Sequence, residues 1–336
     1  MEHNTQIAKG LVVGVDGGGT STRVVLCWID GTVIGAGVGG SGNLHDVGPR
    51  VLRENIELAW REAWEDAGRT PQPAARAVLA MASVGTGGNR ETVRQIAADI
   101  GLAPLEAIRV DIDLVAALAG GLGGEPGIAL IAGTGSSCLG RDPSGAMVQV
   151  GGWGSLLDDV GGATWIGTQA MVAAIRAFDG RGAETVLESQ IMERFDLGNM
   201  RQLLPRVDAE SGVRADRAQL ARLVTEASDS GDEVAQGILR TGADALAECV
   251  ATAHRRLCFG DSRVSVVVTG GLAENVPAYR MMIHGSISGV LPQAQCVAPV
   301  TSNAAGAVLE ALRDAYDGLP ETQVTARVVQ TEFRRA

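Results

Sequence analysis

Long apolar runs are missing from this chain of 336 residues. No stretch approaches the roughly 20 apolar residues that cross a bilayer as a helix. The opening segment, MEHNTQIAKG, also lacks the basic-then-apolar pattern of a secretory signal peptide. We therefore expect no membrane segment and a cytoplasmic protein.

Cysteine pairs and positive charge are also in short supply. The five cysteines are odd in number and widely spaced, without a C-x-x-C pair, which argues against a disulfide framework and against a thiolate metal site. With 28 Lys and Arg against 39 Asp and Glu, the net charge is −11, and no basic stripe is visible. Because a surface that binds the nucleic-acid backbone needs such a stripe, we exclude nucleic acid as the main partner. A nucleotide is not excluded, since backbone amides and one metal ion can hold a triphosphate.

Glycine is abundant, with 46 residues, whereas aromatic residues make up only 3% of the chain. Frequent glycine indicates tight turns and places where the backbone approaches another group closely. The apolar content of 46% and the charged content of 20% are typical of a globular protein, and the length suits two domains.

Extended and helical patterns alternate along the first third of the chain. Three extended runs within residues 11–38 predict a strand meander whose first turn is rich in glycine. Residues 51–68 carry apolar side chains at helical spacing and end at Gly68, which predicts an amphipathic helix. By the same patterns we predict strands in 76–85 and 107–113, and helices in 92–101 and 114–124. Such alternation is typical of an α/β architecture.

A second unit that resembles the first begins at Gly127. Aligned by eye, residues 15–21 lie over residues 131–137, and each segment is a buried strand that enters a glycine-rich turn. An internal repeat of this kind predicts two homologous α/β domains. In this alignment Asp16 is replaced by Ala132 in the second copy. We assign residues 1–120 to an N-terminal domain, 121–318 to a C-terminal domain with helices at 233–257 and 302–315, and 319–336 to an exposed tail.

Three glycine-rich turns each follow a predicted strand: Asp16–Thr20, Gly133–Ser136 and Thr269–Leu272. The first is not a Walker A loop, because no lysine follows the glycines, and no G-x-G-x-x-G with a downstream ribose acid is present. Small and hydroxyl residues would instead let backbone N–H groups and hydroxyls reach phosphate oxygens. A glycine-rich turn alone is a weak signal, and a tight turn without a ligand remains the alternative at each position.

Together, however, the three turns form a known pattern. The order strand-Asp-Gly-x-x-Thr, strand-Gly-Thr-Gly-Ser and strand-Thr-Gly-Gly resembles the phosphate-1, phosphate-2 and adenosine motifs of the actin/hexokinase/heat-shock-70 superfamily. More narrowly, GVDGGGTSTR, IAGTGSSC, VGGWGSLLDDVGGATWIG and VVTGGLAENV look like the N-acetylglucosamine kinase branch of the BadF/BadG/BcrA/BcrD ATPase family. The resemblance extends from about Val12 to Leu312 and is most specific between Gly151 and Gly167.

This resemblance implies a fold and an activity. The fold would be α/β, with two actin-like (ribonuclease H-like) domains flanking a nucleotide cleft. The activity would be transfer of a phosphoryl group from ATP, with Mg²⁺, to the primary hydroxyl of an amino sugar. N-acetylglucosamine would be the first candidate and glucosamine the second, and a homodimer is the family expectation.

The resemblance also implies roles for individual residues. Asp16 matches the acid that positions the nucleotide-bound Mg²⁺, and Asp113 matches the catalytic base. Asn43 and Asp159 match sugar-binding residues, with Trp153 and Gly154 where the wall of the sugar pocket is expected. The nucleotide-binding residues would be Gly17, Gly18, Gly19, Thr20, Ser21 and Thr22 (phosphate-1), Gly133, Thr134, Gly135 and Ser136 (phosphate-2), and Gly270 and Gly271 (adenosine).

Two aspartates compete for the role of base. Asp111 and Asp113 are two residues apart in an extended strand, so alternation places both on the same side. The family register favours Asp113, at the carboxyl end of the strand, where it could accept a proton from a sugar hydroxyl. Capping of the following helix is the alternative role of Asp113. For Asn43 and Asp159 the alternatives are an ordinary turn residue and a loop acid.

Two positions depart from the family pattern, and two other functions stay open. Val160 stands where the kinases often carry Glu, and Ser137 where some carry Asn; both bear on which sugar fits. An ATPase activator of 2-hydroxyacyl-CoA dehydratases needs cysteines for an iron–sulfur cluster, and no second cysteine closely follows Cys138. A non-catalytic sugar sensor usually carries a DNA-binding extension, for which the roughly ten residues ahead of the first strand are too few.

Overall fold

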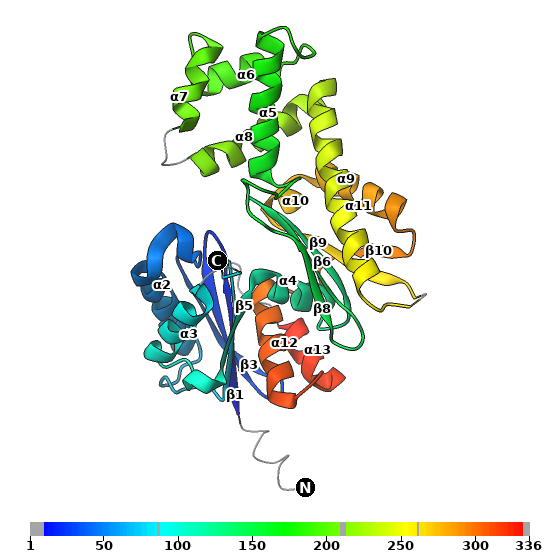
Figure 1. Cartoon of the computed structure of the whole chain (residues 1–336). Helices are drawn as coiled ribbons and strands as arrows, with labels where there is room; N and C mark the ends of the chain where they lie inside the picture. Colours follow the sequence, from blue (N-terminus) through cyan, green and yellow to red (C-terminus); the bar gives the residue numbers. More distant parts are fainter. Residues whose placement is uncertain (1–9, 83, 86–87, 209–212, 261, 332–336) are drawn as a thin grey trace. The chain divides into compact units, whose positions relative to one another are not determined.

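The computed structural model describes residues 10–82, 84–85, 88–208, 213–260 and 262–331 (Figure 1). Contacts between residues divide the chain into two compact units. Unit 1 comprises Met1–Pro126 and Ala298–Ala336, and unit 2 comprises Gly127–Val297. Each unit contains one five-stranded sheet with helices packed on it, so the predicted α/β class with two domains is confirmed.

The sheet of unit 1 is built around its first strand. It consists of β1 (Leu11–Gly17), β2 (Thr22–Trp28), β3 (Val33–Gly39), β4 (Arg76–Met81) and β5 (Ile108–Ile112), in the order β3-β2-β1-β4-β5. The first three strands form the predicted antiparallel meander, and β4 and β5 extend the sheet in parallel on the other side of β1. The carboxyl ends of β1, β4 and β5 therefore lie at one edge, where parallel sheets bind their ligands.

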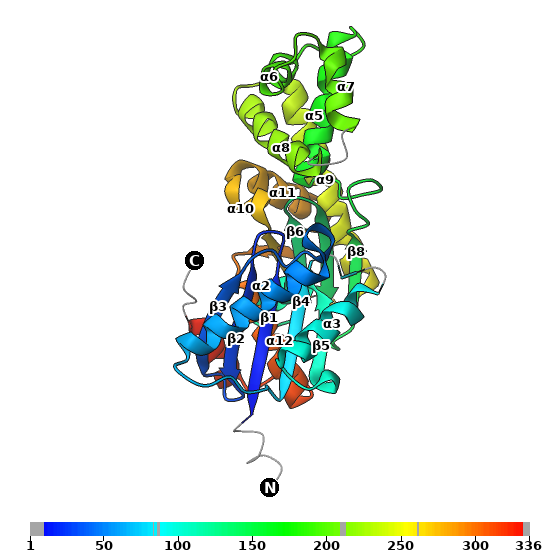
Figure 2. The ribbon, with the colours of Figure 1, turned by 90° about the vertical axis from the view of Figure 1, so that its left-hand side faces the viewer.

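Helices cover both faces of this sheet (Figure 2). α2 (Leu44–Asp66) and α3 (Asn89–Ile100) lie on one face, and α4 (Asp113–Leu122) and α12 (Asn303–Tyr316) lie on the other. The apolar face predicted for residues 51–68 is buried in α2. α2 begins earlier than predicted because it continues through a kink at Gly48, whose φ is 73°.

Unit 2 repeats the topology of unit 1. β6 (Gly127–Ala132), β7 (Ser136–Arg141), β8 (Met147–Gly151), β9 (Val264–Thr269) and β10 (Ala294–Val297) lie in the order β8-β7-β6-β9-β10, with the first three antiparallel and the last two parallel to β6. The predicted internal repeat is thus confirmed in strand order.

The two hairpin turns differ in length. The residue pairs at their bases are Gly17–Thr22 and Ala132–Ser136, which enclose four and three residues respectively. Judged by these pairs, Gly17 corresponds to Ala132, and the alignment by eye is one residue out of step at the turn. In this register the counterpart of Asp16 is Ile131. The alignment by eye differs because it matched the glycines of two turns that are unequal in length.

A helical insertion separates β8 from β9 in unit 2. It opens with α5 (Ala163–Phe178) and closes with α9 (Glu233–Arg256), which packs on β7 and β8 and confirms the helix predicted at 233–257. None of the described helices is long and apolar enough to traverse a bilayer. The other helices are α6 (Leu187–Arg194), α7 (Leu203–Asp208), α8 (Val213–Asp229), α10 (Gly271–Asn275), α11 (Pro277–Val290) and α13 (Thr322–Gln330), with 3-10 turns at Leu105–Ala107 and Met200–Gln202.

The chain returns to unit 1 at Ala298, which differs from the predicted boundaries. α12, capped by Ser302 as predicted, buries Val308, Leu309 and Leu312 in the core of unit 1. The prediction placed this helix in the second domain, because an amphipathic helix does not specify which sheet it covers. The predicted exposed tail, 319–336, is likewise not simply exposed in its described part, since α13 buries two valines in the same core.

Candidate active site

The turn between β1 and β2 presents its backbone to the surroundings. Gly18 N–H donates to Ser21 O at 2.9 Å, which closes the turn, and Gly42 N–H donates to Gly18 O at 2.8 Å. Gly19 and Thr20 are exposed, and no described atom lies within 4 Å of a Cβ built on Gly19. Backbone N–H groups in such an open turn can bind an anion such as a phosphate.

Thr22 lies at the base of this turn. Its side chain is fully buried, and among the described residues its Oγ1 has no hydrogen-bond partner. Gly17 and Gly42 approach so closely that a Cβ on Gly42 would lie 2.5 Å from Gly17 Cα and 2.9 Å from Thr22 Oγ1. Because a buried hydroxyl without a partner is costly, a ligand oxygen at this position would be stabilised.

Asp16 in β1 and Asp113 at the start of α4 lie close enough for their charges to interact. Burial, and after it the charge of Asp113, raises the pKa of Asp16 to about 7, while Arg23 opposes the rise. Burial also raises the pKa of Asp113, and the backbone N–H of Leu114 opposes that rise. Two neighbouring carboxylates with raised pKa values are typical of a site that binds a cation or transfers a proton.

These residues fit a Mg²⁺ ion that is bound together with a nucleotide. Magnesium prefers oxygen ligands and is usually held by one or two carboxylates plus substrate phosphates. The Asp16 carboxylate and the buried hydroxyl of Thr22 supply oxygens beside an open glycine turn. No cage of three or more His, Cys, Asp or Glu side chains occurs within the described ranges, and a nucleotide-bound Mg²⁺ does not need one.

Asp111 and Asp113 differ in their surroundings. Asp111 forms ion pairs with Arg90 at 3.1 Å and with Arg109 at 3.3 Å. Asp113 is the first residue of α4, and its Oδ1 accepts a hydrogen bond from Leu114 N–H at 3.0 Å. In the part of the chain that the structure describes, Asp113 has no ion pair. The carboxylate that is available to accept a proton is therefore that of Asp113.

Asn43 is the N-cap of α2, a role that the sequence analysis did not consider for it. Its Oδ1 accepts a hydrogen bond from His45 N–H at 3.1 Å. The preceding loop is held by Asn55, whose Nδ2 donates to Ser41 O at 2.9 Å. Because a carboxamide carries donors as well as an acceptor, the capping role and a sugar contact are compatible.

The turn 133–135 of unit 2 packs against the start of α5. The N–H groups of Ala163 and Thr164 donate to the carbonyls of Gly133 and Thr134 at 2.9 and 3.0 Å. This turn is therefore fixed by a segment about thirty residues further along the chain, and its carbonyls point toward α5.

Asp159 lies directly against this turn. A Cβ on Gly135 would overlap the Asp159 carboxylate. Val160, the residue after Asp159, is also joined to the end of the turn, because Ser136 Oγ donates to Val160 O at 2.9 Å. Asp159 is 5% exposed and has a φ of 57°, which is uncommon for a residue with a side chain. A buried carboxylate in a sparsely populated backbone conformation is a candidate functional residue. The structure thus brings together two sets predicted separately, the phosphate-2 turn and the sugar-binding acid.

Trp153 and Gly154 lie on an exposed loop. Trp153 is 76% exposed, and it borders a pocket of about 420 Å³ whose other lining residues are Val150, Gly151, Leu157, Asp158, Glu248, Cys249 and Thr252. Asp159 is not among them. Within unit 2, therefore, Trp153 and Asp159, both predicted to contact the sugar, do not line the same pocket.

The turn after β9 requires glycine at Gly270. Its φ is 103°, and a Cβ there would lie 2.7 Å from Ala132 O. Gly271, the other predicted residue, begins α10. Sequence reasoning missed Glu274, whose Oε1 accepts hydrogen bonds from Gly270 N–H at 3.0 Å and from Thr269 Oγ1 at 2.6 Å. The sequence signal that could have identified Glu274 is its spacing of four residues from Gly270, about one helical turn.

The profile of the BadF/BadG/BcrA/BcrD ATPase family matches residues 13–311, nearly the whole chain. The chain belongs to this family. Its two five-stranded α/β units are the actin-like pair that the resemblance implies.

Three proteins that are similar to this chain bear the names of amino-sugar kinases. The N-acetylmuramic acid/N-acetylglucosamine kinase of Clostridium acetobutylicum is 26% identical over 298 residues, 89% of this chain and 97% of that protein. The N-acetyl-D-glucosamine kinase of Dictyostelium discoideum is 26% identical over 316 residues, 91% of this chain and 99% of that protein. A solved structure from Chromobacterium violaceum, assigned as an N-acetylglucosamine kinase, superimposes with a TM-score of 0.69 at 26% identity, covering 91% of this chain and 99% of the other.

The two residues that depart from the pattern of the BadF/BadG/BcrA/BcrD kinases line one pocket. Val160, which stands in place of the frequent Glu, lines a pocket of about 160 Å³ together with Ser137, the other departing residue. Asp158 and Glu248 line the same pocket. The carboxylates at this pocket therefore come from Asp158 and from Glu248 in α9. Sequence spacing does not reveal that these two side chains line one pocket.

Proposed function

We propose that this protein is an ATP-dependent kinase that phosphorylates the primary hydroxyl of an amino sugar, N-acetylglucosamine in the first place and glucosamine in the second. The observation that carries the proposal is the pair Asp16 and Asp113 at the carboxyl edge of the unit 1 sheet, in a chain whose near-full-length relatives are amino-sugar kinases. Asp113 begins α4 and has no ion pair within the described residues, so its carboxylate can accept the proton of a substrate hydroxyl.

Asp113 would act as the general base. As the O–P bond forms between the sugar oxygen and the γ-phosphorus, the hydroxyl proton passes to the Asp113 carboxylate and the bond to the β-phosphate oxygen breaks, which leaves ADP. The raised pKa of Asp113 favours this role, because a base whose pKa is nearer to neutral holds the proton more readily. Asp16 would hold Mg²⁺, which when bound offsets the charge on the phosphates.

The remaining residues would bind the two substrates. Asn43 and Asp159 would contact sugar hydroxyls, and Trp153 and Gly154 would border the sugar. The residues that contact ATP would be Gly17, Gly18, Gly19, Thr20, Ser21 and Thr22, then Gly133, Thr134, Gly135 and Ser136, and finally Gly270 and Gly271. What supports these roles is the open backbone at Gly19, the buried hydroxyl of Thr22 and the packing of Asp159 on Gly135. A homodimer in the cytoplasm belongs to the same proposal.

The test is a panel of sugars incubated with ATP and Mg²⁺. We expect ADP release that depends on N-acetylglucosamine, with glucosamine as the next best acceptor, and a product phosphorylated at the primary hydroxyl by ³¹P–¹H correlation. ATP hydrolysis without any sugar would favour the dehydratase-activator alternative. Sugar binding without turnover would favour a sensor, and turnover of glucose alone would overturn the amino-sugar assignment.

A further inference from the structure

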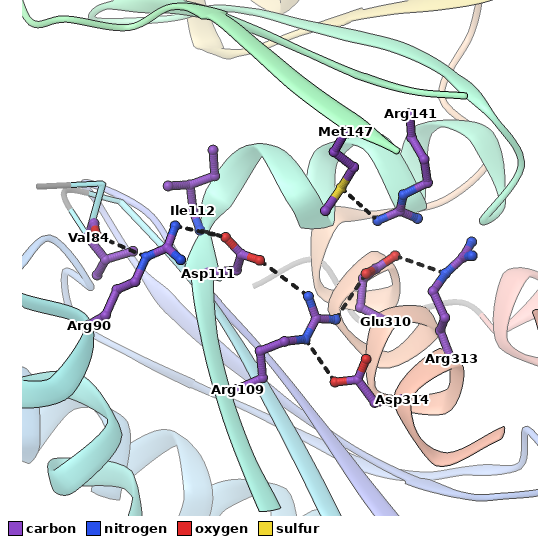
Figure 3. Close-up of polar contacts among 10 residues, drawn as sticks. All are labelled: Val84, Arg90, Arg109, Asp111, Ile112, Arg141, Met147, Glu310, Arg313 and Asp314. Carbon is purple, nitrogen blue, oxygen red and sulfur yellow. Dashed lines mark hydrogen bonds and ion pairs between the residues drawn. The ribbon is translucent and has the colours of Figure 1, made fainter. Parts of the chain in front are cut away.

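Arg109 in β5 joins the strand to α12 through a cluster of ion pairs (Figure 3). Its Nε lies 2.8 Å from Asp314, its Nη2 lies 3.0 Å from Glu310, and its Nη1 lies 3.3 Å from Asp111. The Glu310 side chain is only 2% exposed and also pairs with Arg313 at 3.5 Å. Burial acts to lower the pKa of Arg109, but Asp314 and Glu310 raise it by more, so the guanidinium stays charged.

Asp111 connects this cluster to the backbone just ahead of Asp113. One of its oxygens, Oδ1, accepts hydrogen bonds from Arg90 Nη2 at 3.1 Å and from Ile112 N–H at 2.9 Å. The other, Oδ2, faces Arg109 (Figure 3). The Asp111 side chain is 16% exposed, so these contacts are only partly screened by water.

Ile112 is the N-cap of α4, and its apolar side chain makes no capping hydrogen bond. The orientation of the Asp113 side chain at the start of α4 therefore depends on the backbone at Ile112. That backbone is held by the Asp111 carboxylate, which is itself held from two sides by Arg90 and Arg109. Arg90 in turn reaches Val84 O at 3.4 Å, so the loop after β4 joins the same set of contacts.

We infer that Asp111 and Arg109 are positioning residues for the base, acting on Asp113 through the Ile112 backbone. The inference rests on the proposed kinase function, since it assumes that Asp113 is the base. The ion pairs fix the β5–α4 junction against α12, so that the Asp113 carboxylate keeps one orientation while substrate binds. Geometry of this kind matters because a displacement of about 1 Å can cost on the order of 100-fold in rate.

Two readouts test the inference. Hydrogen–deuterium exchange of the full-length protein reports on the junction whether or not the protein is active, and steady-state kinetics with N-acetylglucosamine reports on the base. Asp111→Ala and Arg109→Met should both speed exchange in peptides that span residues 108–116. Both should also lower kcat by roughly 10- to 100-fold, with KM for sugar and for ATP changed less than about threefold.

Conservative variants separate positioning from simple loss of stability. Asp111→Asn keeps an oxygen that can accept from Ile112 N–H, and Arg109→Lys keeps the charge, so each should recover part of the lost kcat. Asp99→Asn is the matched control, because it removes the Arg53–Asp99 pair of the same unit at 3.4 Å, in which neither Asp111 nor Arg109 takes part, and should leave exchange at 108–116 and kcat unchanged.

Three outcomes would overturn the inference. Unchanged exchange and kcat in Asp111→Ala and Arg109→Met would show that the cluster does not position anything. Equal loss in Asp111→Asn and Asp111→Ala would contradict the role of the Ile112 hydrogen bond, and a loss in Asp111→Asn as large as in Asp113→Asn would make Asp111 itself the base. If wild type phosphorylates no sugar, the proposed function fails, and the exchange data still decide whether these residues hold the junction.

Discussion

Asp113 and Asp111 share one strand end but have opposite surroundings. Two guanidinium groups hold the Asp111 carboxylate, whereas Asp113 forms no ion pair within the described residues and accepts a hydrogen bond from the N–H of Leu114. A carboxylate paired with two arginines is a poor proton acceptor, because protonation would break both pairs. This difference supports the proposal that Asp113, rather than Asp111, is the base.

Asp113→Asn should abolish most turnover while it keeps substrate binding. The amide has the shape of the carboxylate and still accepts the Leu114 N–H, but it cannot take the hydroxyl proton. We expect kcat to fall by roughly 10²- to 10⁴-fold, with sugar affinity largely retained. Initial rates and equilibrium binding of sugar check this; near-wild-type turnover in Asp113→Asn would show that another residue is the base.

Asp16 should make the stability of the metal-free protein depend on pH. Its pKa is raised to about 7 in the folded state, from an ordinary value of 3.8, mainly by burial. Between these values the unfolded chain has lost the proton and the folded protein keeps it, so the contribution of Asp16 to folding becomes less favourable as pH rises toward 7. Since one pKa unit corresponds to about 1.4 kcal/mol, Asp16→Asn should gain at least about 1 kcal/mol over wild type at pH 8.

The gain in Asp16→Asn should shrink as the pH falls toward 4, because the unfolded chain then begins to bind the proton as the folded protein does. Urea unfolding of both proteins at pH 5 and pH 8 in EDTA provides the measurement. A stability difference that is the same at both pH values would mean that Asp16 titrates normally.

The phosphate-2 turn and the Asp159 segment behave as one packed element. Two backbone hydrogen bonds join the turn to α5, a third bond joins Ser136 to Val160 O, and the Asp159 carboxylate occupies the space beside Gly135. Because packed neighbours cannot move independently, a change in the turn should reach the residue proposed to contact the sugar.

Gly135→Ala should therefore raise KM for the sugar, although Gly135 belongs to the proposed nucleotide turn. Its new Cβ overlaps the Asp159 carboxylate and must displace it. Loss of one charge-assisted hydrogen bond corresponds to about 10- to 100-fold in sugar KM. Gly133→Ala is the matched control, since its Cβ would come no closer than 3.7 Å to any described atom. A sugar KM that is equally affected in both variants would contradict the coupling.

α12 joins the two ends of the chain into one core. The helix presses on β1 where Gly14 leaves room, because a Cβ there would lie 2.7 Å from the carbonyl carbon of Ala307. Its buried face meets Val12, Val25 and Val78 of the sheet. Unit 1 is thus built from two segments far apart in the sequence, whereas unit 2 is one continuous segment with its own core.

Fragments should reflect this difference. A chain of residues 127–297 should fold alone, with a cooperative thermal transition by circular dichroism. A chain of residues 1–126 should show no cooperative transition, since it lacks α12, whose apolar side chains form the core on one face of its sheet. Joining 298–336 to 1–126 through a flexible linker should restore cooperativity. Cooperative unfolding of 1–126 alone would mean that α12 is dispensable for unit 1.

Local patterns were enough to predict much of the molecule. The strand meanders, the glycine-rich turns and the helices at 51–68, 233–257 and 302–315 follow from residue periodicity and from turn chemistry, which act between neighbours in the chain. The repeat of one pattern then implied two units of one topology. The residues that form the three turns could be named for the same reason.

Contacts between distant segments were decided only by the tertiary structure. Sequence periodicity does not say that α12 returns to unit 1, that Asp159 lies on Gly135, or that Glu274 holds the turn at Gly270. Nor does it say that arginines from α3 and β5 form ion pairs with Asp111 and not with Asp113. Alternation treats the two aspartates alike, and they differ only because ion pairs form between groups that the folded chain brings together.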